Sequence, residues 1–299
     1  METARKICRR LHAYLRLGNY AGTVHAVYPD AVYCNTSIGM ISILTNAHCL
    51  NPFSAIVTST RELTGFGIEE GQQVLMGDER IEIPGSEFSA DLSQSTDYDL
   101  SMESIKAVFL PVDYDIRLRH ILHAVETNAK EDDLSPIITD LRPNGYSEQV
   151  EPLLPRLNTA FRDQDHAECI EAGSLLAGLG VGLIPSSDRL LCGYMAGYTA
   201  LSAAFGRSFQ RVLEMTRELA GAAAQHTTEL SAAFLLQCGE GLVPEDLFQL
   251  LRNVFSDVPY STLIAAANRI ATMPSGGGAD LLVGVYLALS ALYSGGPID

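Results

Sequence analysis

The hydrophobic pattern of the chain changes near residue 116, and this change constrains the fold more than any other feature. From about residue 22 to residue 112, short runs of β-forming residues alternate with turn signals such as Pro29-Asp30 and Gly77-Asp78. Beyond residue 116 the sequence is rich in Ala and Leu at helical spacing. This order predicts an α+β fold: an N-terminal helix plus a β-rich domain over residues 1–115, shaped as a small barrel or sandwich, then a mostly helical domain over 116–299.

The same patterns predict the individual elements. An amphipathic pattern over residues 3–17 indicates an N-terminal helix, the acidic stretch 86–103 an exposed loop, and the charged, Pro-containing stretch 130–146 a mobile connection. Strands are expected at residues 23–28, 31–35, 38–44, 55–60, 73–76, 81–83 and 106–112. Helices are expected at residues 116–128, 151–162, 167–176, 190–205, 208–223, 227–238, 244–255, 260–270 and 280–292.

The composition excludes several classes of function. A formal charge of −16 over 299 residues disfavours nucleic acid and anionic membrane surfaces as partners. The six cysteines form no CxxC pair, which favours a reduced, cytoplasmic protein without a structural zinc site. The apolar stretches 190–206 and 281–298 each fall short of the ~20 residues that a membrane span requires. We therefore expect a cytoplasmic protein with no membrane segment, no metal and no cofactor.

Two Gly/Ser-rich turns, each opening directly onto a helix, are the main candidates for a functional site. Both turns read Pro-Ser, then small residues, an acidic residue, and Leu-Leu-x-Gly, which suggests two matching helical hairpins that place the turns side by side. The candidate anion-binding residues are Gly180, Gly182, Ser186, Ser187, Asp188 and Arg189 in the first turn, and Ser275, Gly276, Gly277 and Asp280 in the second.

These residue types suit an anion. Glycines allow the backbone to approach a ligand closely, serine hydroxyls donate hydrogen bonds, and a helix start presents free N–H groups with a positive dipole end. Together they favour a phosphate or carboxylate. The alternative is structural, because Ser and Asp are also common helix caps. Arg189 could hold the anion, or it could pair with Asp188 or Glu168.

Other candidates carry weaker signals. His120, His123 and Glu126 share a helix face and could hold a metal, but a solvated face is the favoured interpretation. His48 and Cys49 are adjacent on a strand-like segment, so their side chains point apart and a catalytic dyad is improbable. His25 lies in a strand-like run and could face the core or a cleft.

The first turn, with Gly178-x-Gly180-x-Gly182-Leu183 followed by Pro185-Ser186-x-Asp188, resembles the Gly-x-Gly-x-Gly-Leu-Thr-Pro-Ser-Gly-Asp-Asp signature of a bacterial family that includes the AllH subunit of oxamate carbamoyltransferase. The second turn resembles that family's Ser-Gly-x-Asp-Leu-Leu-x-Gly stretch, and the N-terminal strands resemble its opening.

The resemblance implies a subunit of a hetero-complex that converts oxalurate and phosphate to oxamate and carbamoyl phosphate in allantoin (purine) catabolism. The implied partners are other protein subunits and a small anion such as carbamoyl phosphate, phosphate or oxamate. The chain departs from the family signature at Ile184, Ser187 and Arg189, and an additional glycine stands in the second turn. These departures keep open the alternative of a non-catalytic scaffold or anion-binding subunit with a diverged site.

Overall fold

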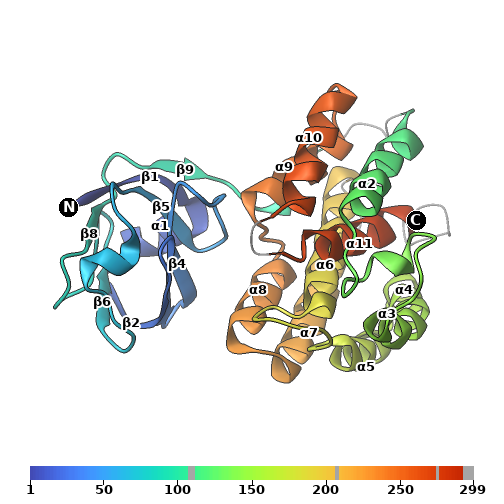
Figure 1. Cartoon of the computed structure of the whole chain (residues 1–299), viewed down its shortest axis with the longest axis horizontal. Helices are drawn as coiled ribbons and strands as arrows, with labels where there is room; N and C mark the ends of the chain where they lie inside the picture. The colour runs from blue at the N-terminus through green and yellow to red at the C-terminus, as the bar shows by residue number, and fades with distance from the viewer. Residues whose placement is uncertain (107–111, 206–208, 274–275, 292–299) are drawn as a thin grey trace. The chain divides into compact units, whose positions relative to one another are not determined.

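The structure, a computed structural model, describes residues 1–106, 112–205, 209–273 and 276–291. The chain divides into two compact units, Met1–Leu100 and Ser101–Asp299, whereas the sequence pattern placed the division at 115/116. The expected α+β class is confirmed: unit 1 is a β-barrel and unit 2 is helical (Figure 1). The strand expected at 106–112 falls almost wholly outside the described residues.

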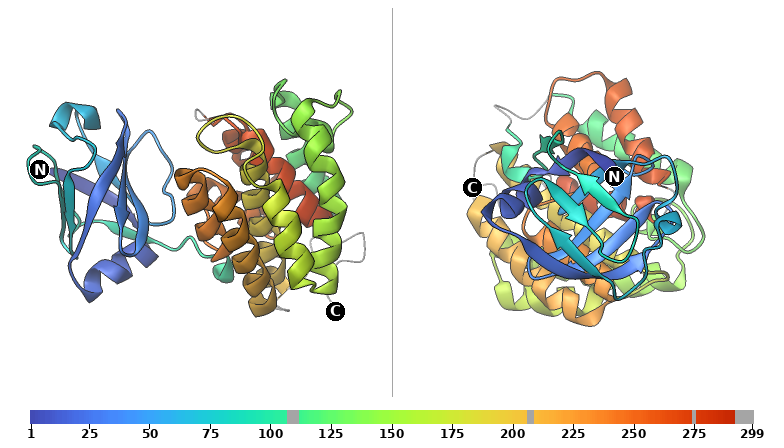
Figure 2. Two further views of the ribbon diagram at one scale, coloured as in Figure 1. Left: turned by 90° about the horizontal axis from the view of Figure 1, so that it is seen from below. Right: turned by 90° about the vertical axis from the view of Figure 1, so that its left-hand side faces the viewer.

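Unit 1 is a closed, mixed barrel of eight strands in the order β5-β4-β3-β2-β6-β7-β8-β1, closed by the pairing of β1 with β5 (Figure 2). The ninth strand, β9, also pairs parallel to β1. It pairs with the C-terminal part of β1, whereas β8 pairs with its N-terminal end. Buried aliphatic side chains fill the interior, and closure leaves few free strand edges. The strands are β1 (Glu2–Cys8), β2 (Tyr20–Val27), β3 (Ala31–Thr36), β4 (Gly39–Thr45), β5 (Ser54–Thr58), β6 (Gln73–Met76), β7 (Arg80–Glu82), β8 (Ser89–Asp91) and β9 (Thr96–Tyr98).

Two sequence expectations in this unit are wrong. The N-terminal helix begins only at Arg9, as α1 (Arg9–Leu17), and the residues before it form β1. The stretch 86–103, expected as an exposed loop, contains β8 and β9. Both segments have weak local strand signals, and their pairing partners lie far away in the sequence, so tertiary contacts decide their structure.

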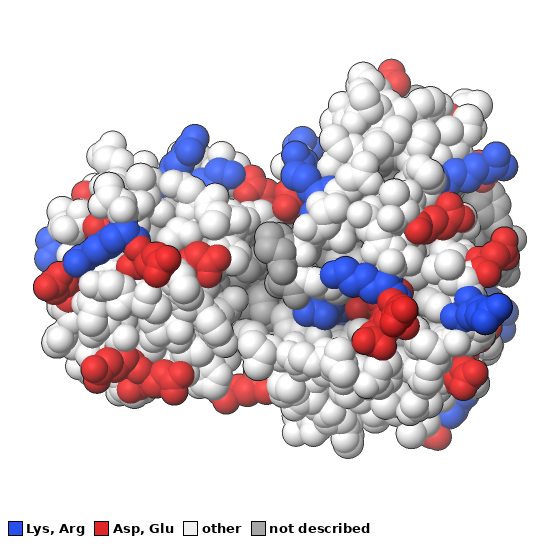
Figure 3. All heavy atoms as spheres, in the orientation of Figure 1, with Lys and Arg blue, Asp and Glu red and all other residues white. Residues whose placement is uncertain are grey.

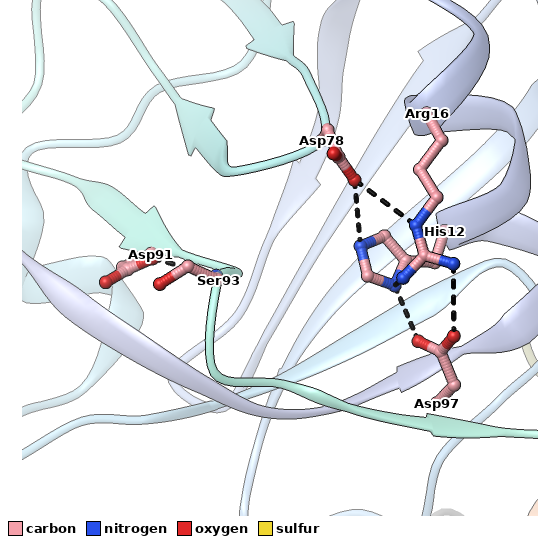
Figure 4. Close-up of polar contacts among 6 residues, drawn as sticks. All are labelled: His12, Arg16, Asp78, Asp91, Ser93 and Asp97. Atoms are coloured by element: carbon pink, nitrogen blue, oxygen red, sulfur yellow. Dashed lines mark hydrogen bonds and ion pairs between the residues drawn. The ribbon is translucent and has the colours of Figure 1, made fainter.

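A buried histidine fastens α1 to the barrel. The ring of His12 lies between two carboxylates, with Nδ1 2.5 Å from Asp97 Oδ1 and Nε2 3.2 Å from Asp78 Oδ1 (Figure 4). Arg16, one turn along the helix, contacts the same two carboxylates at 3.4 and 3.5 Å. The cluster therefore connects α1 with β9 and with the β6–β7 turn.

In unit 2 the other helices surround one almost completely buried helix, α6, which packs against α11, α7 and α8 (Figure 1). The helices expected beyond residue 116 are confirmed, with ends shifted by a few residues. The helices are α2 (Tyr114–Asn128), α3 (Gly145–Val150), α4 (Leu154–Asp163), α5 (His166–Leu176), α6 (Ser186–Phe205), α7 (Phe209–Ala223), α8 (Glu229–Gly239), α9 (Glu245–Val254), α10 (Tyr260–Ala271) and α11 (Gly278–Ser290).

The stretch 130–146, expected as a mobile connection, packs against the helices. Asp133, Leu134 and Ser135 are buried, and Ser135 begins a short 3₁₀ turn that contacts α11. At its end a capping box between Asn144 and Ser147 starts α3. This ordered structure could not be predicted from hydrophobic periodicity, because hydrogen bonds between side chains and backbone, and not a repeating apolar face, hold the segment.

Candidate functional site

The two Gly/Ser-rich turns meet in space because α6 and α11 pack against each other from their N-terminal ends onward. The hydroxyl of Ser186, at the start of α6, hydrogen-bonds the carboxylate of Asp280, in the first turn of α11. Further along, Gly197 of α6 faces Ala288 of α11 so closely that an added Cβ would lie 2.6 Å from the Ala288 Cβ. The expectation that matching turns lie side by side is consistent with these contacts.

The repeated Leu-Leu-x-Gly motif corresponds to a reciprocal contact between the two helices. A Cβ added at Gly193 would lie 2.0 Å from the carbonyl oxygen of Leu281, and a Cβ added at Gly284 would lie 2.0 Å from that of Leu190. The contact therefore has local two-fold character, in which Leu-Leu-x-Gly of one helix faces the same motif of the other.

Within this pair, Arg189 and Asp280 occupy equivalent positions, each one residue before its Leu-Leu-x-Gly motif. This packing also brings two positive helix ends together, which is unfavourable unless negative charge lies nearby.

The first turn is folded back onto its own helix. Gly178, Gly180 and Gly182 have positive φ angles of 79°, 123° and 93°. The Ser187 hydroxyl accepts the Leu179 N–H at 2.9 Å, and the Ser187 N–H donates to the Leu179 carbonyl at 2.9 Å. These bonds satisfy part of the α6 N-terminus from within the protein.

Asp188 is fully buried and holds this loop against α8. One carboxylate oxygen accepts the Gly178 N–H at 2.8 Å. The other accepts the hydroxyl of Ser231 at 2.6 Å and the hydroxyl of Thr227. Since its partners are all in the protein, Asp188 orients the turn and presents no open side to a ligand.

The second turn differs from the first, because no described residue caps the start of its helix. Gly276 and Gly277 are left-handed, with φ of 72° and 68°, and a Cβ at Gly278 would lie 1.7 Å from the Ile270 carbonyl oxygen. Within the described residues, no acceptor is bonded to the backbone N–H groups of residues 278–280. Ser275, also proposed for the site, lies outside the described residues. The described residues therefore supply no acceptor to the N-terminus of α11, and unbonded donors of this kind are what an anion site requires.

Arg189 extends from α6 across this open turn. A Cβ added at Gly277 would lie 2.1 Å from Arg189 Nη1, so the guanidinium lies against the glycine backbone. Burial lowers the pKa of Arg189, against the opposing effect of Asp280. Among the residues that the structure describes, no carboxylate lies within ion-pair distance of it, and Glu168 pairs with Arg156 instead, at 2.5 Å.

Asp280 is a buried carboxylate at the same place. Its side chain is 1% exposed, accepts the Leu134 N–H at 2.8 Å and is hydrogen-bonded by Ser186. Burial raises the pKa of Asp280 to about 6, with Asp133 adding to the shift and the two hydrogen bonds and Arg189 opposing it. The group is therefore poised between its charged and neutral forms near neutral pH.

The stretch 130–135 also contributes to this place, which sequence patterns did not predict. The ammonium of Lys130 lies 3.9 Å from the position of a Cβ at Gly276. Asp133 accepts the N–H groups of Lys130 and Ser135, which shapes the segment, and Leu134 donates to Asp280. The Ser135 hydroxyl is buried and has no hydrogen-bond partner within the described part of the chain. No local signal in the sequence could have identified these residues.

The remaining histidine candidates lie elsewhere. His25 is the extra residue of a β-bulge in β2, between Val24 and Ala26. His48 Nε2 is 2.9 Å from Asp30 in the barrel unit. His123 is exposed 3.7 Å from Glu126, whereas His120 packs on the Tyr260 ring. Within the described ranges, no cluster of His, Cys, Asp or Glu residues has the arrangement of a metal site.

The surface charge is dispersed. On the face drawn in Figure 3, the described Lys and Arg side chains are interspersed with Asp and Glu side chains. Any anion must therefore be attracted by local donors, against a net charge of −16. Among the described helices, none combines the length and the hydropathy needed to cross a bilayer.

Comparison with known proteins gives two matches, one in each unit. Residues 176–289, which include both turns, match the family model described as oxamate carbamoyltransferase subunit AllH. Residues 3–97, which form the barrel, match the model described as the AllH family N-terminal domain. No curated protein and no solved structure matches the chain.

Proposed function

The chain belongs to the AllH family, and on that premise we propose that its helical unit binds a small oxyanion at the N-terminus of α11, as one subunit of a carbamoyltransferase complex. The anion class comprises carbamoyl phosphate, phosphate and oxamate. Each carries phosphate or carboxylate oxygens, which backbone N–H groups and a guanidinium recognise.

The observation that carries the proposal is the position of Arg189. Its guanidinium is partly desolvated and lies against Gly277, at the start of α11. Among the described residues it has no ion-pair partner, and the N–H groups of residues 278–280 have no acceptor. A partly desolvated cation is unfavourable unless negative charge lies close to it, and Asp280 and Asp188 act on Arg189 only from beyond ion-pair distance. A bound oxyanion would contact the guanidinium directly and would accept hydrogen bonds from the helix start.

This arrangement suits carbamoyl transfer, a reaction that depends on holding a phosphate or carboxylate in place while charge develops on the carbonyl oxygen. Arg189 and the N–H groups of residues 278–280 would hold the anion. Lys130, near Gly276, would add a second positive charge. Because the family name designates a subunit, the rest of the reaction site would come from partner chains.

A thermal-shift experiment tests the proposal. Oxamate, carbamoyl phosphate or phosphate is expected to raise the Tm of the purified chain, and Arg189→Gln to abolish the rise. The matched control is Arg211→Gln, which removes an exposed arginine of α7 and should leave the rise intact. A folded wild-type chain whose Tm responds to none of the three anions would contradict the proposal.

A second candidate function, a scaffold subunit without its own ligand, is favoured by one observation. The loop of the first turn exposes two large apolar side chains, Val181 (57%) and Leu183 (59%), while its Ser187 and Asp188 make only internal bonds. Such a loop suits contact with a partner chain. The double variant Val181→Ser/Leu183→Ser would then lose co-purification with partner subunits, and wild-type Tm would not respond to anions.

A further inference from the structure

The carboxylate of Asp280 lies close enough to Arg189 for the two charges to interact, so it lies near the proposed anion site. It belongs to the first turn of α11, faces Ser186 of α6, and is covered by Leu134. Two negative groups this close in a buried place repel each other strongly. An oxyanion and an ionised Asp280 therefore cannot share the site without a large loss of affinity.

We propose that Asp280 receives the anion as a neutral carboxylic acid, so that binding takes up a proton and the acid O–H donates a hydrogen bond within the site. The inference rests on the proposed function. It assigns Asp280 the role of a proton-holding residue, which distinguishes it from Asp188, the acidic residue of the other turn.

The hydrogen bonds of Asp280 are compatible with both protonation states. One oxygen accepts the Leu134 N–H at 2.8 Å, and a neutral acid retains that acceptor while its other oxygen carries the proton. The Ser186 hydroxyl, which donates to the carboxylate, can rotate to accept from the acid and then donate elsewhere. Gain of the proton therefore requires no rearrangement of the backbone.

The charges that face Asp280 favour the neutral form once an anion is present. The stretch 130–135 contributes Asp133, which repels a second negative charge, and α6 contributes Arg189, which an anion would engage. Among the described residues, α2 and α10, the other helices packed on α11, contribute no charge that acts on it. With the pKa of Asp280 already raised to about 6 by burial, a neighbouring anion brings the protonated form into the neutral pH range.

Calorimetry on the full-length chain tests the inference. Oxamate is the probe, because its charge does not change between pH 6 and pH 9, and titrations are run at pH 7 in buffers with different ionisation enthalpies. We expect uptake of about one proton per oxamate, and an affinity that falls by up to about tenfold per pH unit above pH 7. Asp280→Asn is expected to bind with no proton uptake and no pH dependence over this range.

The matched control is Asp165→Asn, at the N-cap of α5, where asparagine caps equally well and proton uptake should persist. Oxamate binding to the wild-type chain without proton uptake would overturn this inference and leave the proposed function standing. Absence of oxamate binding would overturn both. The wild-type measurement decides the matter even if Asp280→Asn does not fold.

Discussion

Gly284 of α11 lies against the backbone of Leu190 of α6, with no space between them for a side chain. A Cβ at Gly284 would lie 2.0 Å from the Leu190 carbonyl oxygen and 2.7 Å from the Tyr194 nitrogen. Both atoms belong to a buried helix backbone, so neither can move aside as a flexible side chain would. This contact fixes the distance between the two helix N-termini, and therefore the shape of the proposed site.

Gly284→Ala is accordingly expected to force the helices apart and to lower the free energy of unfolding by about 3 kcal/mol or more. The control is Gly221→Ala in α7, where an added Cβ meets nothing within 4 Å. That change should raise the stability by about 0.5–1 kcal/mol, because alanine is the better helix former. Urea unfolding measures both variants, and equal effects would refute the close-packing argument.

Alanine substitutions at the neighbouring glycines Gly276 and Gly277 distinguish the effect of backbone strain from the effect of contact with Arg189. Their φ angles are nearly equal, 72° and 68°, so alanine at either position should cost about 1 kcal/mol in strain. Only at Gly277 would the new Cβ lie on the guanidinium, 2.1 Å from Nη1. We expect similar losses of stability from the two variants, and loss of the anion-induced Tm rise from Gly277→Ala alone. An anion response retained by Gly277→Ala would argue against a role for Arg189.

Much of the fold could be predicted because local patterns agree with it. β6 has the predicted bounds, and the helices from α4 onward begin and end close to the predicted residues. Their apolar periodicity can be recognised from the local sequence alone. β1 was missed because charged and apolar residues are interleaved from residue 3 to residue 17 in a way that suits one continuous helix. Only pairing with β5, β8 and β9 makes it a strand.

The site was predictable only in part, for the same physical reason. The repeated Leu-Leu-x-Gly motif indicated that the two turns belong together, and the Ser186–Asp280 contact is consistent with this. The sequence could not reveal that Asp188 is satisfied by Thr227 and Ser231, residues about forty positions away. Nor could it reveal Lys130, since a side chain beside a distant turn leaves no local pattern.

Asp188 is expected to act on the loop and not on the ligand. Asp188→Ala would leave the Gly178 N–H and the hydroxyls of Thr227 and Ser231 without their buried acceptor, so we expect a loss of about 2–4 kcal/mol. Limited proteolysis should then show faster cleavage within residues 178–184. Thr227→Ser keeps the hydroxyl and serves as the control, with little change in either measurement. Normal stability of Asp188→Ala would show that these hydrogen bonds contribute little.

Asp280 should give the stability of the chain a distinct pH dependence. Its folded-state pKa, about 6, is above the 3.8 of an unperturbed aspartate, so the folded chain binds the proton more tightly than the unfolded chain. The stabilisation due to that proton is complete below pH 4 and is lost as the pH rises through 6; it amounts to at most about 3 kcal/mol.

Asp280→Asn lacks this titration and resembles the neutral acid. Its stability relative to wild type is therefore expected to increase by up to about 2 kcal/mol between pH 4.5 and pH 8. Urea unfolding at intervals of half a pH unit measures the difference, with Asp165→Asn as the control that should follow wild type. A constant difference across this range would mean that Asp280 titrates at its ordinary pKa, and its burial would then need another counter-charge.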